Sequence, residues 1–187
     1  MSLDKSHPRL IIYISIVMYI ISSCNSEHRK IRQTLRNFSK LEISIPDNIQ
    51  CIYNKTISAI KVDTMHSYKF IIFYDWNECS SCKLSAIKEL IPIYKTAYQN
   101  NCSVIMIFSP HQTYAESLIS EVFYQNIEIP IYIDTENTFK LINPEIPSDP
   151  RFHYFLIDDK HHPIFIGNPI SNKELWDLFT ETLRQSN

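Results

Sequence analysis

The chain has 187 residues, of which 44% are apolar and 20% charged, and its formal net charge at pH 7 is -2. These values are typical of a globular protein and exclude a disordered, collagen-like or coiled-coil chain. Its one glycine, Gly167, excludes the glycine-rich loops that bind nucleotide phosphates. The small net charge gives no reason to expect a nucleic-acid partner.

Residues 1–23 are predicted to be an export signal. Lys5 and Arg9 precede an almost entirely apolar run at residues 10–22, which is short for a membrane-spanning helix of about 20 residues. The small residues before Cys24 resemble the lipobox of bacterial lipoproteins, in which a peptidase cuts before a cysteine that then carries the lipid. This resemblance implies a lipid anchor at Cys24 on the periplasmic side of a bacterial membrane. An ordinary signal peptide followed by a chance cysteine is the alternative.

Residues 24–40 are predicted to form a basic tether between this anchor and the main domain. Ile31, Leu35 and Phe38 recur at helical spacing. The other positions carry a set of basic side chains, namely Arg29, Lys30, Arg32, Arg36 and Lys40. Such a helix is either drawn to anionic lipid headgroups or packs its apolar stripe on the domain with its charges in solvent.

Residues 41–187 are predicted to form one α/β domain. A strand or hairpin is expected within residues 41–61, and the apolar runs at three later places predict buried strands: 70–74, 102–108 and 131–133. Helices are expected from Cys79 to about Gln99 with a kink at Pro92, and near residues 114–123 and 135–141. In the second of these helices, Tyr114 is expected on the apolar stripe. This alternation of strands and helices indicates a parallel sheet with helical crossovers.

The C-terminal part is predicted to change to antiparallel pairing. Residues 152–157 and 163–167 form a candidate hairpin whose second strand lies at a sheet edge, because Pro163 cannot donate a backbone hydrogen bond. Ser171 and Glu174 are spaced as a capping box for a terminal helix. Its apolar stripe is expected to comprise Leu175, Leu178, Phe179 and Leu183.

Two of the remaining cysteines, Cys79 and Cys82, form a C-x-x-C pair at an expected helix start. There the first sulfur lies near unpaired backbone N–H groups, which lower a thiol pKa from about 8.5 to roughly 3.5–7.5. Because the thiolate is the nucleophile, Cys79 is predicted to attack a partner's disulfide. Cys82, expected one turn inward and less exposed, would resolve the mixed disulfide. Cys51 and Cys102 lie in apolar runs and are expected to be buried thiols, with a disulfide between them as the alternative.

These elements in this order resemble the thioredoxin fold, and most closely the exported TlpA- and ResA-type thiol-disulfide oxidoreductases. The resemblance covers residues 41–185 and includes Trp76, Lys83 and the run Phe155-Leu156-Ile157-Asp158. It implies a three-layer α/β sandwich, with a central mixed sheet and helices on both faces. It also implies disulfide exchange with envelope proteins, a membrane electron donor or acceptor as a second partner, and no cofactor. Trp76 would shield the cysteines or contact the partner, and Lys83 would add positive charge near them.

The chain also departs from this family. The proline that precedes the F-L-I-D strand in relatives is replaced by Phe152, and Pro150 could substitute through a cis peptide only if the loop is rearranged. The buried acid of thioredoxin is replaced by Phe73, so proton transfer requires another group or water. At the turn where relatives often have glycine, His161 is expected to adopt a left-handed conformation.

Two other functions are compatible with the same cysteines. Cys79 and Cys82 are soft ligands that could carry Cu(I), with His153 or His111 as a third ligand. Alternatively, the protein is a redox-inactive thioredoxin-like binding lipoprotein in which the two cysteines form a static disulfide. The missing proline favours this last alternative.

Overall fold

The computed structural model describes residues 26–47, 49–58, 66–125 and 127–185. Residues 26–38 are helical, in agreement with the predicted helix. The chain divides into residues 1–37 and a compact unit, Phe38–Asn187. The predicted export signal and Cys24 lie outside the described residues. Among the helices that are described, none is both long and apolar enough to cross a membrane.

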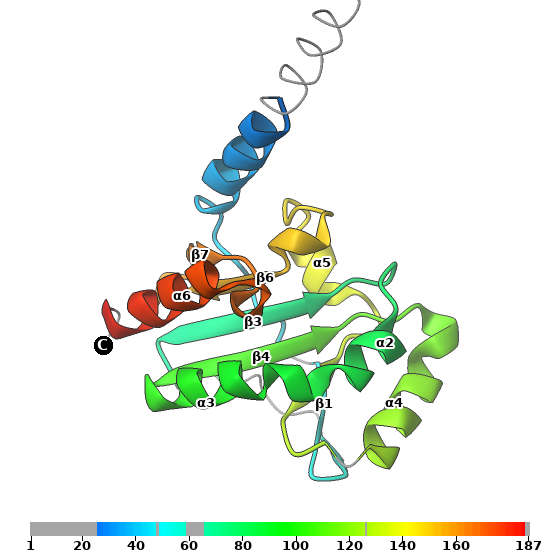
Figure 1. Ribbon diagram of the computed structural model, residues 1–187. Helices are drawn as coiled ribbons and strands as arrows, with labels where there is room; N and C mark the ends of the chain where they lie inside the picture. The colour runs from blue at the N-terminus through cyan, green and yellow to red at the C-terminus, as the bar shows by residue number, and fades with distance from the viewer. Residues whose placement is uncertain (1–25, 48, 59–65, 126, 186–187) are drawn as a thin grey trace, which may run out of the picture. The chain divides into compact units, whose positions relative to one another are not determined.

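The compact unit is built on a mixed β-sheet, shown in Figure 1. Across the sheet, the seven strands of the described residues follow the order β2-β1-β5-β4-β3-β6-β7. The neighbours β3–β4 and β4–β5 are parallel, and the other neighbouring pairs are antiparallel. The strands are β1 (Gln50–Tyr53), β2 (Thr56–Ser58), β3 (Tyr68–Tyr74), β4 (Cys102–Phe108), β5 (Ile131–Ile133), β6 (Tyr154–Ile157) and β7 (Pro163–Ile166).

Two hairpins flank the parallel centre of the sheet. Asn54 and Lys55 connect β1 to β2, and both have positive φ angles, 48° and 57°, which is the geometry of a two-residue turn that matches strand twist. The predicted C-terminal hairpin is confirmed as β6–β7, with β7 at the sheet edge. His161 lies in its turn with a φ of 63°, which confirms the expected left-handed conformation.

Helices cover both faces of the sheet. They are α2 (Ser80–Ser85), α3 (Ile91–Gln99), α4 (Ala115–Tyr124), α5 (Thr138–Ile142) and α6 (Lys173–Gln185), with single 3-10 turns at η1 (Ile87–Leu90), η2 (Gln112–Tyr114), η3 (Pro150–Phe152) and η4 (Pro169–Ser171). Side chains of β3 alternate between the two faces. On one face Phe70 packs on Phe179 of α6, with the ring centroids 4.9 Å apart. On the other face Phe73 packs on Phe139 of α5 at 5.0 Å.

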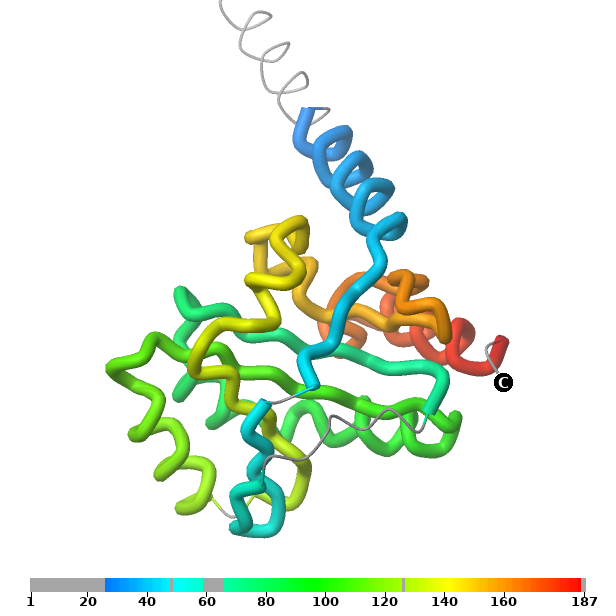
Figure 2. Tube along the Cα trace, turned by 180° about the vertical axis from the view of Figure 1, so that it is seen from behind, coloured from blue at the N-terminus to red at the C-terminus, as the bar shows by residue number. Residues whose placement is uncertain are grey.

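The segment that follows residue 38 covers part of the second face, as Figure 2 shows from behind. Phe38 is fully buried and its ring lies 5.0 Å from that of Phe155 in β6. Further along, the Asn143 side chain accepts a hydrogen bond from the Ser44 N–H and donates one to the Ser44 carbonyl, both at 2.8 Å. This segment is therefore an integral part of the domain.

Several predicted details of the helices are wrong. The continuous helix from Cys79 to Gln99 is interrupted by η1, and Pro92 lies in the first turn of a new helix, α3, where a proline costs no hydrogen bond. The terminal helix is capped by Asn172, whose side chain accepts from the Leu175 N–H at 2.8 Å, instead of by Ser171. Tyr114 and Leu178, both expected on apolar stripes, are 65% and 51% exposed.

Candidate functional site

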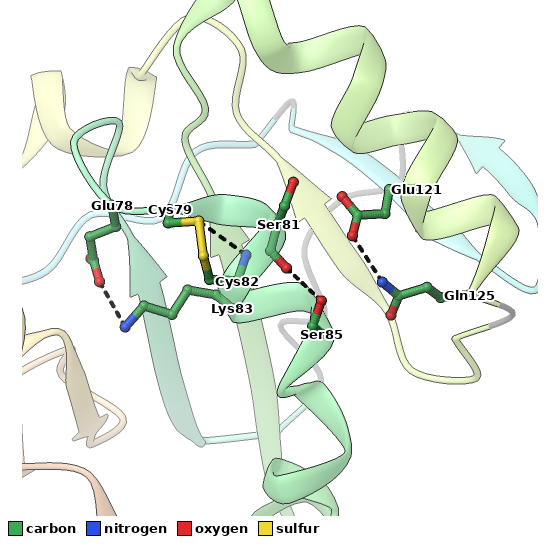
Figure 3. Close-up of a disulfide and its surroundings, with 8 residues drawn as sticks. All are labelled: Glu78, Cys79, Ser81, Cys82, Lys83, Ser85, Glu121 and Gln125. Atoms are coloured by element: carbon green, nitrogen blue, oxygen red, sulfur yellow. Dashed lines mark hydrogen bonds and ion pairs between the residues drawn. A yellow bond between two sulfur atoms is a disulfide. The ribbon is translucent and has the colours of Figure 1, made fainter.

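The cysteine pair lies where the chain turns from β3 into α2. The carboxylate of Asp75 accepts a hydrogen bond from the Trp76 N–H at 2.8 Å, and its carbonyl accepts from the Glu78 N–H at 2.9 Å. This turn delivers Cys79 to the N-cap of α2. Cys79 and Cys82 form a disulfide, with their Cα atoms 5.3 Å apart. The Cys82 N–H donates to the Cys79 sulfur at 3.3 Å (Figure 3).

Both cysteines are exposed, although Cys82 was expected to lie further inward than Cys79. The reason lies in the helical period. Cys79 and Cys82 are three residues apart and share one face of α2, whereas Leu84, the buried residue of this helix, points away from that face. The two sulfurs differ in one contact, because the Cys82 N–H donates a hydrogen bond to the sulfur of Cys79.

Glu78, immediately before Cys79, is the centre of a polar network that the sequence analysis missed. Its side chain is only 8% exposed. One carboxylate oxygen lies 3.1 Å from His153 Nδ1 and accepts from the Asp75 N–H at 3.2 Å. The other oxygen lies 3.1 Å from Lys83 Nζ, which also stands 5.3 Å above the Tyr74 ring. The positive charge of Lys83, which was expected to act on the cysteines, is thus shared with a carboxylate.

This network controls the ionisation of Glu78. Burial by itself would raise the pKa of the carboxyl group. Hydrogen bonds from His153, the Asp75 backbone and Lys83 outweigh burial and hold the pKa of Glu78 below its ordinary value. The folded protein therefore keeps an ionised carboxylate directly beside the cysteine pair.

His153 belongs to this network and not to a metal site. It is completely buried, and its ring nitrogens are engaged by Glu78 and by the Pro147 carbonyl, which accepts from Nε2 at 2.8 Å. Both ring nitrogens therefore already have partners within the protein. Across the described ranges, no three His, Cys, Asp or Glu side chains are grouped so that they could hold a metal.

Pro150 does not replace the missing proline. No peptide bond within the described residues is cis. Pro150 instead opens the 3-10 turn η3, which is capped by the Asp149 side chain. Phe152, which stands where the resemblance led us to expect the proline, is buried. The rearranged loop that the sequence analysis required for Pro150 is therefore absent.

On the side of the disulfide toward α4, a cleft of about 270 Å³ opens beside Cys79. Trp76 lines it and is 56% exposed. Across from it, His111 and Tyr114 come from the segment between β4 and α4. The three rings form a row, because the ring centroids of Trp76 and His111 are 6.3 Å apart and those of His111 and Tyr114 are 6.1 Å apart.

The two other cysteines described are buried thiols, as predicted, and are not bonded to one another. Burial raises the pKa of Cys51, and it raises the pKa of Cys102 to about 12. A thiol that is both sealed and protonated is a poor nucleophile. The reactive sulfur chemistry of the domain is thus confined to Cys79 and Cys82.

Comparisons with known proteins agree on the fold. No protein-family model and no curated protein matches the sequence. Among solved structures, the thioredoxin domain of a thiol-disulfide oxidoreductase from Bacteroides vulgatus superposes with a TM-score of 0.51 at 12% identity, covering 76% of this chain and 98% of that one. The chain has a thioredoxin-like fold.

Two further structures superpose less closely. A thioredoxin-like protein from Porphyromonas gingivalis gives a TM-score of 0.47 at 14% identity and covers 78% of this chain and 93% of that one. AhpC from Enterococcus faecalis gives 0.46 at 13% identity and covers 78% of this chain and 92% of that one. In the thioredoxin-like fold of this chain, the cysteine pair stands at the start of the helix that follows β3.

The difference in burial between the cysteines predicts their reactivity. In the reduced native protein, iodoacetamide at neutral pH should label Cys79 and Cys82, while Cys51 and Cys102 react only in urea. Peptide mass spectrometry of timed samples measures this, and the urea sample is the control in which all four cysteines are labelled. Labelling of Cys51 or Cys102 in native protein at the rate of Cys79 would contradict the structure.

The lowered pKa of Glu78 predicts a dependence of stability on pH. Because the folded pKa is below the unfolded value, the ionised group stabilises the protein above about pH 4.3, and this contribution is lost as the pH falls through the folded pKa. Glu78→Gln should therefore lower the free energy of unfolding by about 1–3 kcal/mol at pH 7 and flatten its decline in acid. Urea titrations of the oxidised protein from pH 7 to pH 3 measure both effects.

Glu145→Gln is the matched control for this measurement, because Glu145 is exposed. This change should alter neither the free energy of unfolding at pH 7 nor its decline in acid. If the free energy of unfolding declined equally in acid for Glu78→Gln and for the unaltered chain, the role assigned to the carboxylate would be refuted.

Proposed function

We propose that this protein is a thiol-disulfide oxidoreductase that exchanges disulfides with other proteins through Cys79 and Cys82. The observation that carries the proposal is the exposed cysteine pair at the start of α2 in a thioredoxin-like fold. The similar domain from Bacteroides vulgatus, which belongs to a thiol-disulfide oxidoreductase, supports it.

The exchange proceeds in two steps when the reduced protein meets a partner disulfide. The Cys79 thiolate attacks one partner sulfur, a mixed disulfide forms, and the other partner sulfur leaves as a thiolate. The Cys82 thiolate, its proton released to solvent, then attacks the Cys79 sulfur and displaces the second partner sulfur. Two electrons pass to the partner and the Cys79–Cys82 disulfide forms. The same steps run in reverse when the oxidised protein meets a partner dithiol.

The geometry supports the assignment of Cys79 as the attacking residue. The Cys82 N–H that points at its sulfur would stabilise a thiolate there, because a hydrogen bond to the charged form lowers a pKa. The Glu78 carboxylate would oppose a second negative charge nearby, and its pairing with Lys83 and His153 reduces that repulsion. The negative charge of Glu78, next to the attacking sulfur, is thus partly balanced by its partners.

We further propose that the protein works outside the cytosol, anchored through a lipid on Cys24 to the periplasmic side of a bacterial membrane. Support comes from the apolar run at residues 10–22 and the small residues before Cys24. Disulfides persist in such a compartment, so its substrates would be disulfide-containing envelope proteins. A membrane electron donor or acceptor would restore the starting state of the cysteine pair after each exchange.

Cysteine variants test the redox proposal. The chain with Cys24→Ser should show a reversible two-electron couple in glutathione buffers, which is absent in Cys79→Ser and Cys82→Ser. Cys82→Ser should trap a mixed disulfide with an oxidised protein substrate, because no second thiol resolves it, whereas Cys79→Ser should trap none. Non-reducing gels with mass spectrometry detect the adduct.

The result also separates the alternatives. Stoichiometric Cu(I) binding that either cysteine change abolishes, without a couple, would replace the proposal with metal transport. The absence of both properties would leave a binding protein with a static disulfide.

Anchoring is tested in bacterial cells that express the full chain. Labelled palmitate should be incorporated into the protein and lost with Cys24→Ser, while Cys79→Ser, the control, stays labelled. Mass spectrometry should show that the mature protein begins at Cys24. An unlabelled protein cut at another position would contradict the lipid anchor.

A further inference from the structure

We infer that the cleft beside Cys79 selects disulfides whose cysteine is flanked by an aromatic or large aliphatic side chain. This inference rests on the proposed function and adds the class of substrate. It depends on the row of aromatic rings formed by Trp76, His111 and Tyr114, together with the burial of Phe152 and His153 directly before β6.

A mixed disulfide places the partner's cysteine at the Cys79 sulfur, so the neighbouring residues of the partner must rest on the surface around it. In the loop before β6, the two residues next to the strand offer little surface, because Phe152 is 7% exposed and His153 is not exposed at all, whereas Arg151 is exposed. The opposite side is open, since Cys79 itself lines the cleft that runs toward α4.

Trp76 and Tyr114 are 56% and 65% exposed although they are large aromatic side chains, and two buried apolar residues, Pro110 and Leu118, also line the cleft. Exposed aromatic rings that surround a reactive atom are typical of contact surfaces, where burial of such rings contributes most of the binding free energy.

Among the described residues that line the cleft, the only carboxylate belongs to Glu78, and it is already paired with His153 and Lys83. The lining includes no lysine or arginine. Apart from His111, the lining therefore offers a charged side chain of a partner no unpaired ionic group to offset its lost hydration, whereas an aromatic side chain would exchange water for ring contacts.

The size of the cleft limits how much of a partner it can bind. A volume of about 270 Å³ is slightly below the range of pockets that hold whole drug-sized ligands. The cleft therefore accepts one large side chain of the partner, next to its cysteine, and is too small for a folded domain or a large cofactor. His111 is held in place there, because its Nδ1 accepts a hydrogen bond from the Thr113 N–H at 3.3 Å.

The test uses short peptides with an internal disulfide, in which the residues flanking one cysteine are Phe, Ala or Glu. The reduced mature chain with Cys24→Ser is mixed with each peptide, and the second-order rate constant is measured in a stopped-flow instrument through tryptophan fluorescence or by acid quench. The Phe peptide should react about tenfold or more faster than the Glu peptide, with the Ala peptide between them.

Variants test whether the cleft is responsible for the preference for the Phe peptide over the Glu peptide. Tyr114→Ala and Trp76→Ala should each reduce the ratio of the Phe rate to the Glu rate toward one, with acid quench used as the readout where Trp76 is absent. Tyr124→Ala is the matched control: Tyr124 lies on α4, is 91% exposed and does not line the cleft. It should keep the ratio of the unaltered chain. Because all three side chains are largely exposed, none of these changes removes a core residue.

The outcomes separate this inference from the proposed function. Equal rates for the Phe and Glu peptides, or a ratio that survives both cleft variants, would overturn the substrate preference while the oxidoreductase function stands. A failure to react with any peptide and with oxidised glutathione would instead overturn the proposed function. A lower ratio with Tyr124→Ala would show that the preference lies outside the cleft and would also overturn the inference.

Discussion

The contact between Glu78 and His153 joins two parts of the chain that are 75 residues apart. Glu78 precedes the first cysteine, and His153 precedes β6, whose backbone pairs with β3. The His153 carbonyl also accepts a hydrogen bond from the Phe73 N–H at 2.9 Å, so the ladder between β3 and β6 continues as far as this residue. The turn that carries the cysteines is thereby fixed to the centre of the sheet, and the accessible sulfurs stand on a rigid base although the residues around them are exposed.

Most of the fold could be predicted from local patterns. The continuous apolar runs gave β4 and β5 with their observed bounds and β3 to within two residues, because strands buried on both faces leave a distinctive sequence. The interruption between α2 and α3 could not be predicted in this way. Leu84, Ile87 and Leu90 are all buried, and their spacing fits a single helix as well as it fits two helices joined by a 3-10 turn.

The cysteine pair could be predicted from the sequence, whereas the polar network around it could not. The spacing of Cys79 and Cys82 identified the sulfurs, since that pattern depends on local geometry alone. Glu78 and His153 were missed as partners because their contact depends on tertiary packing. One signal was available: with Phe73 in place of the buried acid of thioredoxin, another carboxylate near the cysteines was to be expected, and Glu78 is adjacent to them. The exposure of Cys82 likewise depends on which face of α2 meets the core.

The edge strand β7 has a consequence if the protein exchanges disulfides with other polypeptides, as proposed. It begins with Pro163, which has no N–H to donate, and the β6–β7 pairing is irregular between Leu156 and Ile157. An edge interrupted in this way is a poor template for an incoming strand. Partially folded clients, which expose unpaired backbone, would therefore gain little by adding to this side of the sheet, and the domain could meet them repeatedly at its sulfurs without co-aggregating.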